Sequence, residues 1–192
     1  MTRIHGFPPV ANTAARILIL GSMPGQASLE ANQYYAHPRN AFWHIVSELV
    51  GVAPDAPYAA RTRALKSAGI ALWDVLQSCQ RQGSLDAMIQ AETQAINDFQ
   101  KFFRSHRRIT RIYFNGATAE TIFKRHVLPA LDKFSASLTR LPSTSPAHAG
   151  MSFDEKLEAW RVILQPEKKK LIARNFQADR AAMSRYKRRG LA

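Results

Sequence analysis

The 192-residue sequence contains a single cysteine, Cys79, and no apolar run close to the length of a membrane span. One cysteine excludes an internal disulfide and any zinc or iron–sulfur site that needs several thiolates. The six histidines lack the spacing of a ligand set, so we expect no metal and no cofactor. The first residues lack the apolar core of a signal peptide. We therefore expect a monomeric cytoplasmic protein that does not bind membranes.

Acidic side chains are also scarce, because 14 Asp and Glu stand against 27 Lys and Arg and leave a net charge of +13. Residues 165–192 contain nine of the basic side chains and two of the acidic ones. This balance favours a polyanionic partner, and nucleic acid is a better match than an acidic membrane surface. We predict one domain, residues 1–165, and a basic extension, residues 166–192, which either grips a nucleic-acid backbone or only adds solubility.

Apolar runs alternate with helical periodicities along the chain. Short apolar runs predict strands, and apolar residues at helical spacing predict amphipathic helices. This alternation is typical of a three-layer α/β/α domain with a mostly parallel sheet. The expected strands are 16–20, 70–75, 111–115 and 137–141, and the expected helices are 40–50, 58–68, 93–103, 116–127 and 154–164.

Polar loops follow three of the expected strands. The first strand leads into Gly21-Ser-Met-Pro-Gly25, the third into Asn115, and the fourth into residues 142–150. The carboxyl ends of parallel strands share one edge of the sheet, and ligands bind at that edge. A further polar stretch, Ala36-His-Pro-Arg-Asn-Ala-Phe-Trp43, lies just before an expected helix. Together these loops predict a site.

The same motifs resemble the uracil-DNA glycosylase superfamily, and most of all its hypoxanthine-DNA glycosylase branch, the DNA-deoxyinosine glycosylases. The resemblance spans about residues 6–165 and is carried by Gly21-Ser-Met-Pro-Gly25, the run from Tyr35 to Trp43, Tyr113-Phe-Asn-Gly116 and Leu141-Pro-Ser-Thr-Ser-Pro146. It implies a four-stranded parallel sheet in the order 2-1-3-4. It also implies a monofunctional enzyme that flips a deaminated base out of DNA and hydrolyses its N-glycosidic bond, with hypoxanthine as first candidate and uracil as second.

The resemblance also implies roles for individual residues. Asn40 is the catalytic candidate, which would position a water molecule and present its carbonyl oxygen to the developing cation. Tyr35 would stack on the flipped base, and Asn115 would read the edge of the base. Met23 departs from the Asn or Asp of many relatives, and His148 departs from the Asn of this branch. The remaining binding candidates are Gly21, Ser22, Met23, His37, Ser143, Ser145 and His148.

Several of these residues have a purely structural alternative. Asn40 suits a helix N-cap, and Asn115 suits a cap between a strand and a helix. The loop around Ser143 has hydroxyls for phosphate oxygens, although a Ser/Thr/Pro cluster is also common in plain connections. Asp74 is set aside as a helix cap or an ion-pair partner, and we expect Cys79 to be buried and not nucleophilic.

Other functions also remain open at this point. A mismatch-specific uracil/thymine glycosylase shares the order of the motifs, and a non-catalytic nucleic-acid-binding domain would explain the charge. A small-molecule enzyme is disfavoured, because the sequence lacks both a glycine-rich phosphate fingerprint and a Gly-x-Ser-x-Gly elbow.

If the basic extension grips DNA, deleting residues 168–192 will weaken duplex binding and flatten its salt dependence. Each lost phosphate contact reduces the slope of log K against log salt by about 0.9. Fluorescence anisotropy of the full and shortened chains over a salt series measures both effects. An unchanged slope would mean that the extension only adds solubility.

Overall fold

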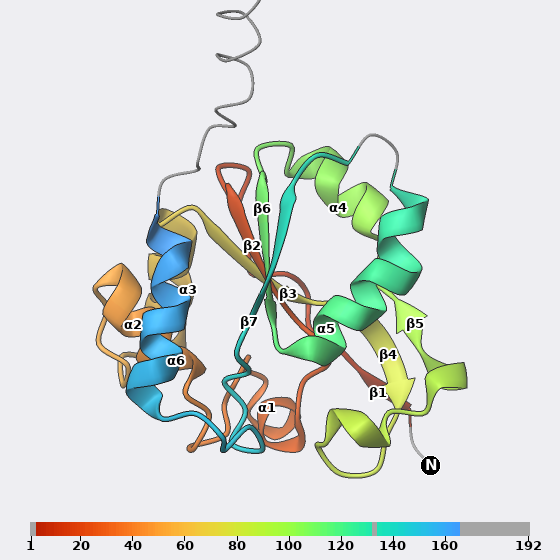
Figure 1. Ribbon diagram of the computed structural model, residues 1–192, viewed down its shortest axis with the longest axis horizontal. Helices are drawn as coiled ribbons and strands as arrows, with labels where there is room; N and C mark the ends of the chain where they lie inside the picture. The colour runs from red at the N-terminus through yellow and green to blue at the C-terminus, as the bar shows by residue number, and fades with distance from the viewer. Residues whose placement is uncertain (1–2, 132–133, 166–192) are drawn as a thin grey trace, which may run out of the picture.

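A four-stranded parallel sheet forms the middle layer of the structure, a computed structural model that describes residues 3–131 and 134–165 (Figure 1). Its strands are β2 (Ile17–Gly21), β3 (Ile70–Asp74), β6 (Arg111–Asn115) and β7 (Ser137–Leu141). They lie in the order β3-β2-β6-β7, which is the expected order 2-1-3-4. The predicted α/β fold class and sheet topology are therefore confirmed.

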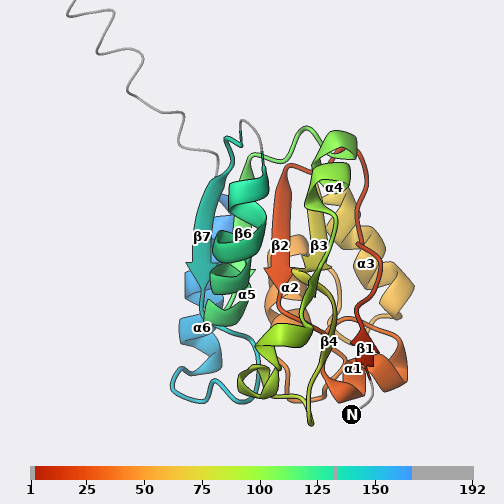
Figure 2. The ribbon, with the colours of Figure 1, turned by 90° about the vertical axis from the view of Figure 1, so that its right-hand side faces the viewer.

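Helices cover both faces of this sheet, as Figures 1 and 2 show. On one face lie α2 (Phe42–Val50), α3 (Tyr58–Ser67) and α6 (Phe153–Trp160). On the other lie α4 (Phe99–Ser105) and α5 (Ala117–Ile122), the latter continued by a π-helical turn, Phe123–Val127, and a 3₁₀ turn, Leu128–Ala130. The short helix α1 (Gln26–Ala31) lies beside the carboxyl ends of the strands. In the described residues, no helix has the length and apolarity required to cross a bilayer.

Burial on both faces explains why β2 reads as a continuous apolar run. Residues 17–21 of β2 are all buried, as expected for a central parallel strand between two layers of helices. Aromatic side chains fill the space on either side of the sheet. Phe42 meets Trp160 edge-on at 5.8 Å on one face, and Phe114 packs against Phe123 at 5.3 Å on the other.

The strands also end level with one another. Gly21 pairs with Asp74, Leu20 pairs with Phe114, and Asn115 pairs with Leu141. The loops after all four strands therefore leave the same edge of the sheet at the same height. This register brings together segments that lie more than a hundred residues apart in the sequence.

A second sheet was not predicted. It is antiparallel and consists of β1 (Arg3–His5), β4 (Leu76–Gln80) and β5 (Ala95–Ile96). The prediction of a helix over 93–103 is therefore wrong for the first half of this range. Ile96 pairs with Leu76 in β5, and α4 starts only at Phe99, after Asp98 accepts a hydrogen bond from the Lys101 amide. The prediction extended the helix too far because Ile96 stands at helical spacing from the phenylalanines that follow it. A single apolar residue fits the period of a strand equally well.

Other boundaries shift by less. The first expected helix starts at Phe42 with Ala41 at its N-cap, and the strand expected over 70–75 ends at Asp74. The helix expected over 154–164 is α-helical up to Trp160 and then continues as a 3₁₀ turn, Arg161–Leu164. Leu164 is exposed in this turn and does not face inward. Cys79 is buried, as expected.

Candidate functional site

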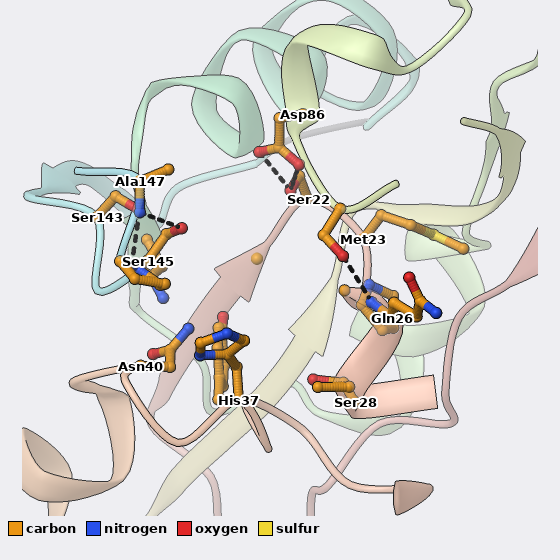
Figure 3. Close-up of a pocket in the computed structure, with 18 of the residues that line it drawn as sticks. Ser22, Met23, Gln26, Ser28, His37, Asn40, Asp86, Ser143, Ser145 and Ala147 are labelled. Atoms are coloured by element: carbon orange, nitrogen blue, oxygen red, sulfur yellow. Dashed lines mark hydrogen bonds between the residues drawn. The ribbon is translucent and has the colours of Figure 1, made fainter. Parts of the chain in front are cut away.

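A pocket of about 660 Å³ opens at the carboxyl edge of the parallel sheet (Figure 3). Ligand pockets typically occupy about 300–1,000 Å³. The structure brings all of the site residues named from the sequence into its lining, namely Gly21, Ser22, Met23, Tyr35, His37, Asn40, Asn115, Ser143, Ser145 and His148. Side chains of α1, of the loop after β4 and of Asp74 at the end of β3 also contribute to the lining, and the sequence did not predict a part for them in the site.

The loop after α1 places Tyr35 against the pocket. Its ring stacks on Phe42 with centroids 4.0 Å apart and planes 21° apart. Its backbone has φ of 54°, which is uncommon for a bulky residue and must be held by the surroundings. The indole N–H of Trp43 donates to the carbonyl of Tyr34, and the Ala36 amide donates to the hydroxyl of Ser28. These bonds fix the aromatic wall before any ligand binds.

His37 and Asn40 lie side by side on the same wall (Figure 3). The Arg39 amide donates to His37 Nδ1 at 3.1 Å, so the neutral ring carries its proton on Nε2. The Phe42 amide donates to Asn40 Oδ1 at 3.0 Å. Asn40 thus satisfies one amide of the first turn of α2 from the position before the N-cap. Within residues 3–131 and 134–165, one lone pair of Oδ1 and both Nδ2 protons are left for a ligand.

Thr144 connects this wall to the end of β6. Asn115 Nδ2 donates to the Thr144 hydroxyl at 2.8 Å, and the Thr144 amide donates to Asn115 Oδ1 at 2.8 Å. The Ala41 amide donates to the Thr144 carbonyl at 3.0 Å. The Asn115 amide is therefore partly occupied by structural bonds. No feature of the sequence distinguished Thr144, which is fully buried, from the neighbouring serines.

The loop after β7 forms the rim of the pocket. The indole of Trp160 donates to the Pro142 carbonyl, and the buried ammonium of Lys156 donates to the His148 carbonyl. Ser143 and Ser145 accept hydrogen bonds from amides two residues further along the chain. The rim is thus a fixed row of hydroxyls, whereas the His148 side chain lies at its exposed end.

The opposite wall comes from the loop after β4. Asp86 accepts hydrogen bonds from the Ser22 hydroxyl at 2.7 and 2.8 Å (Figure 3). Ser84 accepts a hydrogen bond from the Gln26 amide at 2.9 Å. The buried guanidinium of Arg81 donates to the carbonyls of Pro24 and Gly83. These contacts depend on the second sheet, so a sequence reading without that sheet could not place them in the site.

Asp74 lies at the floor of the pocket and is only 3% exposed. Burial raises its pKa to about 8; the nearby carboxyl of Asp86 adds to this rise, and Arg81 opposes it. Its Oδ2 has no hydrogen-bond partner among the residues that the structure describes. Burial also raises the pKa of Asp86, although the Ser22 hydroxyl works in the opposite direction. A neutral carboxyl group therefore stands where an Asp would ordinarily be ionised.

Gly21 makes room for this arrangement. A Cβ at this position would collide with Oδ1 of Asp74 and would lie 2.7 Å from the hydroxyl of Tyr35. Gly25, at the other end of the same loop, has no such constraint, since its Cβ would lie 3.5 Å from Ser84 at an ordinary contact distance.

A smaller hollow lies on the other side of Asn40. It is lined by residues 38–41 together with His44, Phe153 and Lys156, and it has a volume of about 290 Å³. The Arg39 side chain is exposed there. Basic and imidazole groups beside the main pocket are suited to a phosphate neighbouring a bound nucleotide.

In the described residues, no three His, Cys, Asp or Glu side chains are grouped so that they could hold a metal ion. The chemistry available at this site is therefore that of amides, hydroxyls, a phenol, an imidazole and two carboxyl groups with raised pKa values.

Replacing Gly21 with alanine is expected to destabilise the protein by about 1–3 kcal/mol, because Asp74 or Tyr35 must move to admit the methyl group. The Gly25→Ala variant adds the same atom at an ordinary contact distance from Ser84, so its free energy of unfolding should stay close to that of the wild type. Urea unfolding of the three proteins tests this, and equal effects at the two glycines would contradict the close packing at Gly21.

The raised pKa of Asp74 makes stability dependent on pH. The folded chain holds this proton between the ordinary pKa and about 8, so stability should fall as pH rises through that window. Asp74→Asn removes this loss and should raise the midpoint of thermal unfolding at pH 8 by about 2–4 °C or more. Melting curves from pH 5 to 9 test this. The exposed Asp55→Asn is the control and should leave the slope unchanged.

Comparison with known proteins agrees with this fold. Residues 8–164 match the family profile of the Uracil DNA glycosylase superfamily. A hypoxanthine DNA glycosylase from Methanosarcina acetivorans is 34% identical, covering 84% of this chain and 98% of that protein. One from Methanosarcina barkeri is 39% identical over 58% of this chain and 70% of that protein.

A solved structure has the same architecture. The solution NMR structure of a candidate uracil DNA glycosylase from Methanosarcina acetivorans superposes with a TM-score of 0.69 at 33% identity, covering 85% of this chain and all of the other. The residues that match the family profile, 8–164, include the parallel sheet and the loops that form the pocket. The chain therefore belongs to the uracil DNA glycosylase superfamily.

Proposed function

We propose that this protein is a DNA glycosylase that removes hypoxanthine from DNA by hydrolysing the N-glycosidic bond. The observation that carries the proposal is that Tyr35, Asn40 and Asn115 line one pocket at the carboxyl edge of the sheet. The relatives named as hypoxanthine DNA glycosylases support this choice of base, and uracil is the second candidate. A mismatch-specific uracil/thymine glycosylase is the alternative within the superfamily.

A base inside a duplex cannot reach such a pocket, so the nucleotide must be flipped out of the stack. Tyr35 would receive the flipped base on the ring face away from Phe42. Base–aromatic stacking contributes about 1–3 kcal/mol per base and favours any planar base. Since Phe42 holds the ring in place from behind, stacking would cost little reorganisation.

Asn40 would act on the sugar. As the bond between C1′ and the base nitrogen breaks, its electron pair leaves with the base and C1′ becomes cationic. A water molecule then adds to C1′, and its proton is transferred to the departing base. An amide has no useful basicity, so Asn40 would orient this water and turn the free lone pair of Oδ1 toward the cation. The bond from the Phe42 amide fixes that orientation in advance.

The rim and the basic hollow would hold the backbone of the flipped nucleotide. Ser143 and Ser145 offer hydroxyls, and Arg39 lies in the smaller hollow beside Asn40. His148 stands at the exposed end of the rim, where it would touch a phosphate or an oxygen of the leaving base. His37 would present Nε2–H to the same ligand.

The remaining expectations concern the whole chain. The family match to residues 8–164 supports a catalytic domain over 1–165. The basic extension 166–192 lies outside the described residues, and its role in DNA binding stays a prediction. We propose that the enzyme works as a cytoplasmic monomer without metal or cofactor.

Excision from labelled duplexes carrying hypoxanthine, uracil, xanthine or a G·T mismatch tests the proposal, with abasic sites revealed by alkaline cleavage in the presence of EDTA. Asn40→Ala is expected to lower hypoxanthine excision by about 10²–10³-fold, because it removes a group acting on the transition state. Duplex binding should remain, since the phosphate contacts are intact.

Asn12→Ala is the matched control. Asn12 lies before β2, at the edge of the sheet away from the pocket. The Asn12→Ala variant should therefore cleave hypoxanthine duplexes as the wild type does. Cleavage at uracil alone would place the enzyme in a sister branch. Binding without cleavage of any substrate would favour a non-catalytic nucleic-acid-binding domain.

A further inference from the structure

The floor of the pocket holds a buried oxygen atom that lacks a partner. Within the described chain, Oδ2 of Asp74 makes no hydrogen bond. Asp74 lines the pocket together with Tyr35, and both side chains approach the same face of Gly21. A buried polar group without a partner costs about 1–3 kcal/mol, so an unpaired carboxyl oxygen in the lining of a pocket points to a ligand that satisfies it.

We propose that Asp74, acting as a neutral carboxylic acid, reads the edge of the flipped base. Its O–H would donate to the base carbonyl, and its C=O would accept the adjacent ring N–H. Deamination creates this pair of groups, because it replaces an exocyclic amino group by a carbonyl and protonates the neighbouring ring nitrogen. This assignment rests on the proposed glycosylase function and makes Asp74 its specificity-determining residue.

Asn115 is the less suitable reader on geometric grounds. Its amide already gives one donor and one acceptor to Thr144 at 2.8 Å each. Moving it toward a base would break the contact that holds the rim to β6. Asp74 ends β3, which lies on the opposite side of β2 from β6. Within the described residues no hydrogen bond occupies its Oδ2, so this oxygen can turn to a ligand without breaking a structural contact. Asn115 then positions the rim, while Asp74 contacts the base.

Burial is the main reason that the pKa of Asp74 is raised, and the groups that face it add to this effect. The carboxyl of Asp86, from the loop after β4, disfavours a second negative charge, and the Arg81 guanidinium of the same segment only partly compensates. The phenols from the loop after α1 and from α3 are neutral, because burial raises the pKa of each of them; they are Tyr34, Tyr35 and Tyr58. An ionised Asp74 could only accept hydrogen bonds, and it would repel the carbonyl oxygen of the base.

The test is the pH profile of single-turnover excision from pH 5.5 to 9.5. The wild type should lose activity tenfold per pH unit above about 8, where Asp74 ionises. Asp74→Asn keeps a donor and an acceptor that cannot ionise, so it should lose less than about tenfold at pH 7 and lack this alkaline fall. Asp74→Ala should lose more than about a hundredfold at all pH values.

Asp86→Asn provides an electrostatic control. Removal of this neighbouring charge lowers the pKa of Asp74, so the alkaline fall should move to lower pH. A purely structural role for Asp74 would leave the position of the fall unchanged. Ionisation of the base itself affects all variants alike, so an alkaline fall in Asp74→Asn equal to that of the wild type would overturn the proposal. So would an inactive but folded Asp74→Asn, which would indicate a catalytic carboxylate.

Binding separates this proposal from the glycosylase proposal. A duplex with 2′-fluoro-deoxyinosine resists cleavage, because the fluorine disfavours the sugar cation, and it still presents the base edge. The wild type should prefer it over an adenine duplex at pH 6.5 and lose most of that preference at pH 9, whereas Asp74→Asn should keep it. If the wild type shows this binding pattern but cleaves no hypoxanthine duplex, the glycosylase proposal is overturned and the role of Asp74 in reading the base is not. A preference that does not depend on pH in the wild type would overturn the role of Asp74.

Discussion

The level ends of the four parallel strands are the constraint on which the site depends. Backbone hydrogen bonds place Gly21 beside Asp74 and align Asn115 with Leu141, so four loops start from one row. Gly21 stands in the middle of this row, and its missing side chain leaves the space in which Asp74 and Tyr35 meet. A shift of one strand by one residue would turn Asp74 toward the opposite face of the sheet.

Hydrogen bonds from buried groups then hold the loops in place. Thr144 binds the end of β6 and the start of α2 together, and Arg81 binds the loop after β4 to Pro24. These bonds satisfy backbone groups that would otherwise be buried without partners. The consequence for function is preorganisation, because the groups that would meet the transition state are already in position and need little reorganisation.

The charges of the chain divide by location. The chain has a net charge of +13, which suits a DNA backbone, yet its pocket contains the carboxyl groups of Asp74 and Asp86. Burial raises the pKa of Asp74 to about 8, and a neutral acid does not repel a polyanion, whereas the Asp86 carboxylate is paired with Arg81 at 3.8 Å. A strongly basic chain and an acidic pocket floor are thus compatible, since the floor would meet the base and the basic side chains would meet the phosphates.

Local patterns in the sequence predicted the strands of the parallel sheet and the loops around the pocket other than the one after β4, and the family resemblance supplied the strand order. Strand periodicity, turn residues and the family motifs are all short-range signals, and each of the residues they named lines the pocket. The second sheet could not be predicted because β5 has two residues and β1 has three. Such short strands do not show the alternation of apolar and polar residues that indicates a strand. Only the tertiary structure decided that Asp74 is neutral and that Asn115 is engaged by Thr144. A pKa and a hydrogen-bond partner depend on what surrounds a side chain in space, and the neighbours concerned lie 12 and 29 residues away along the chain.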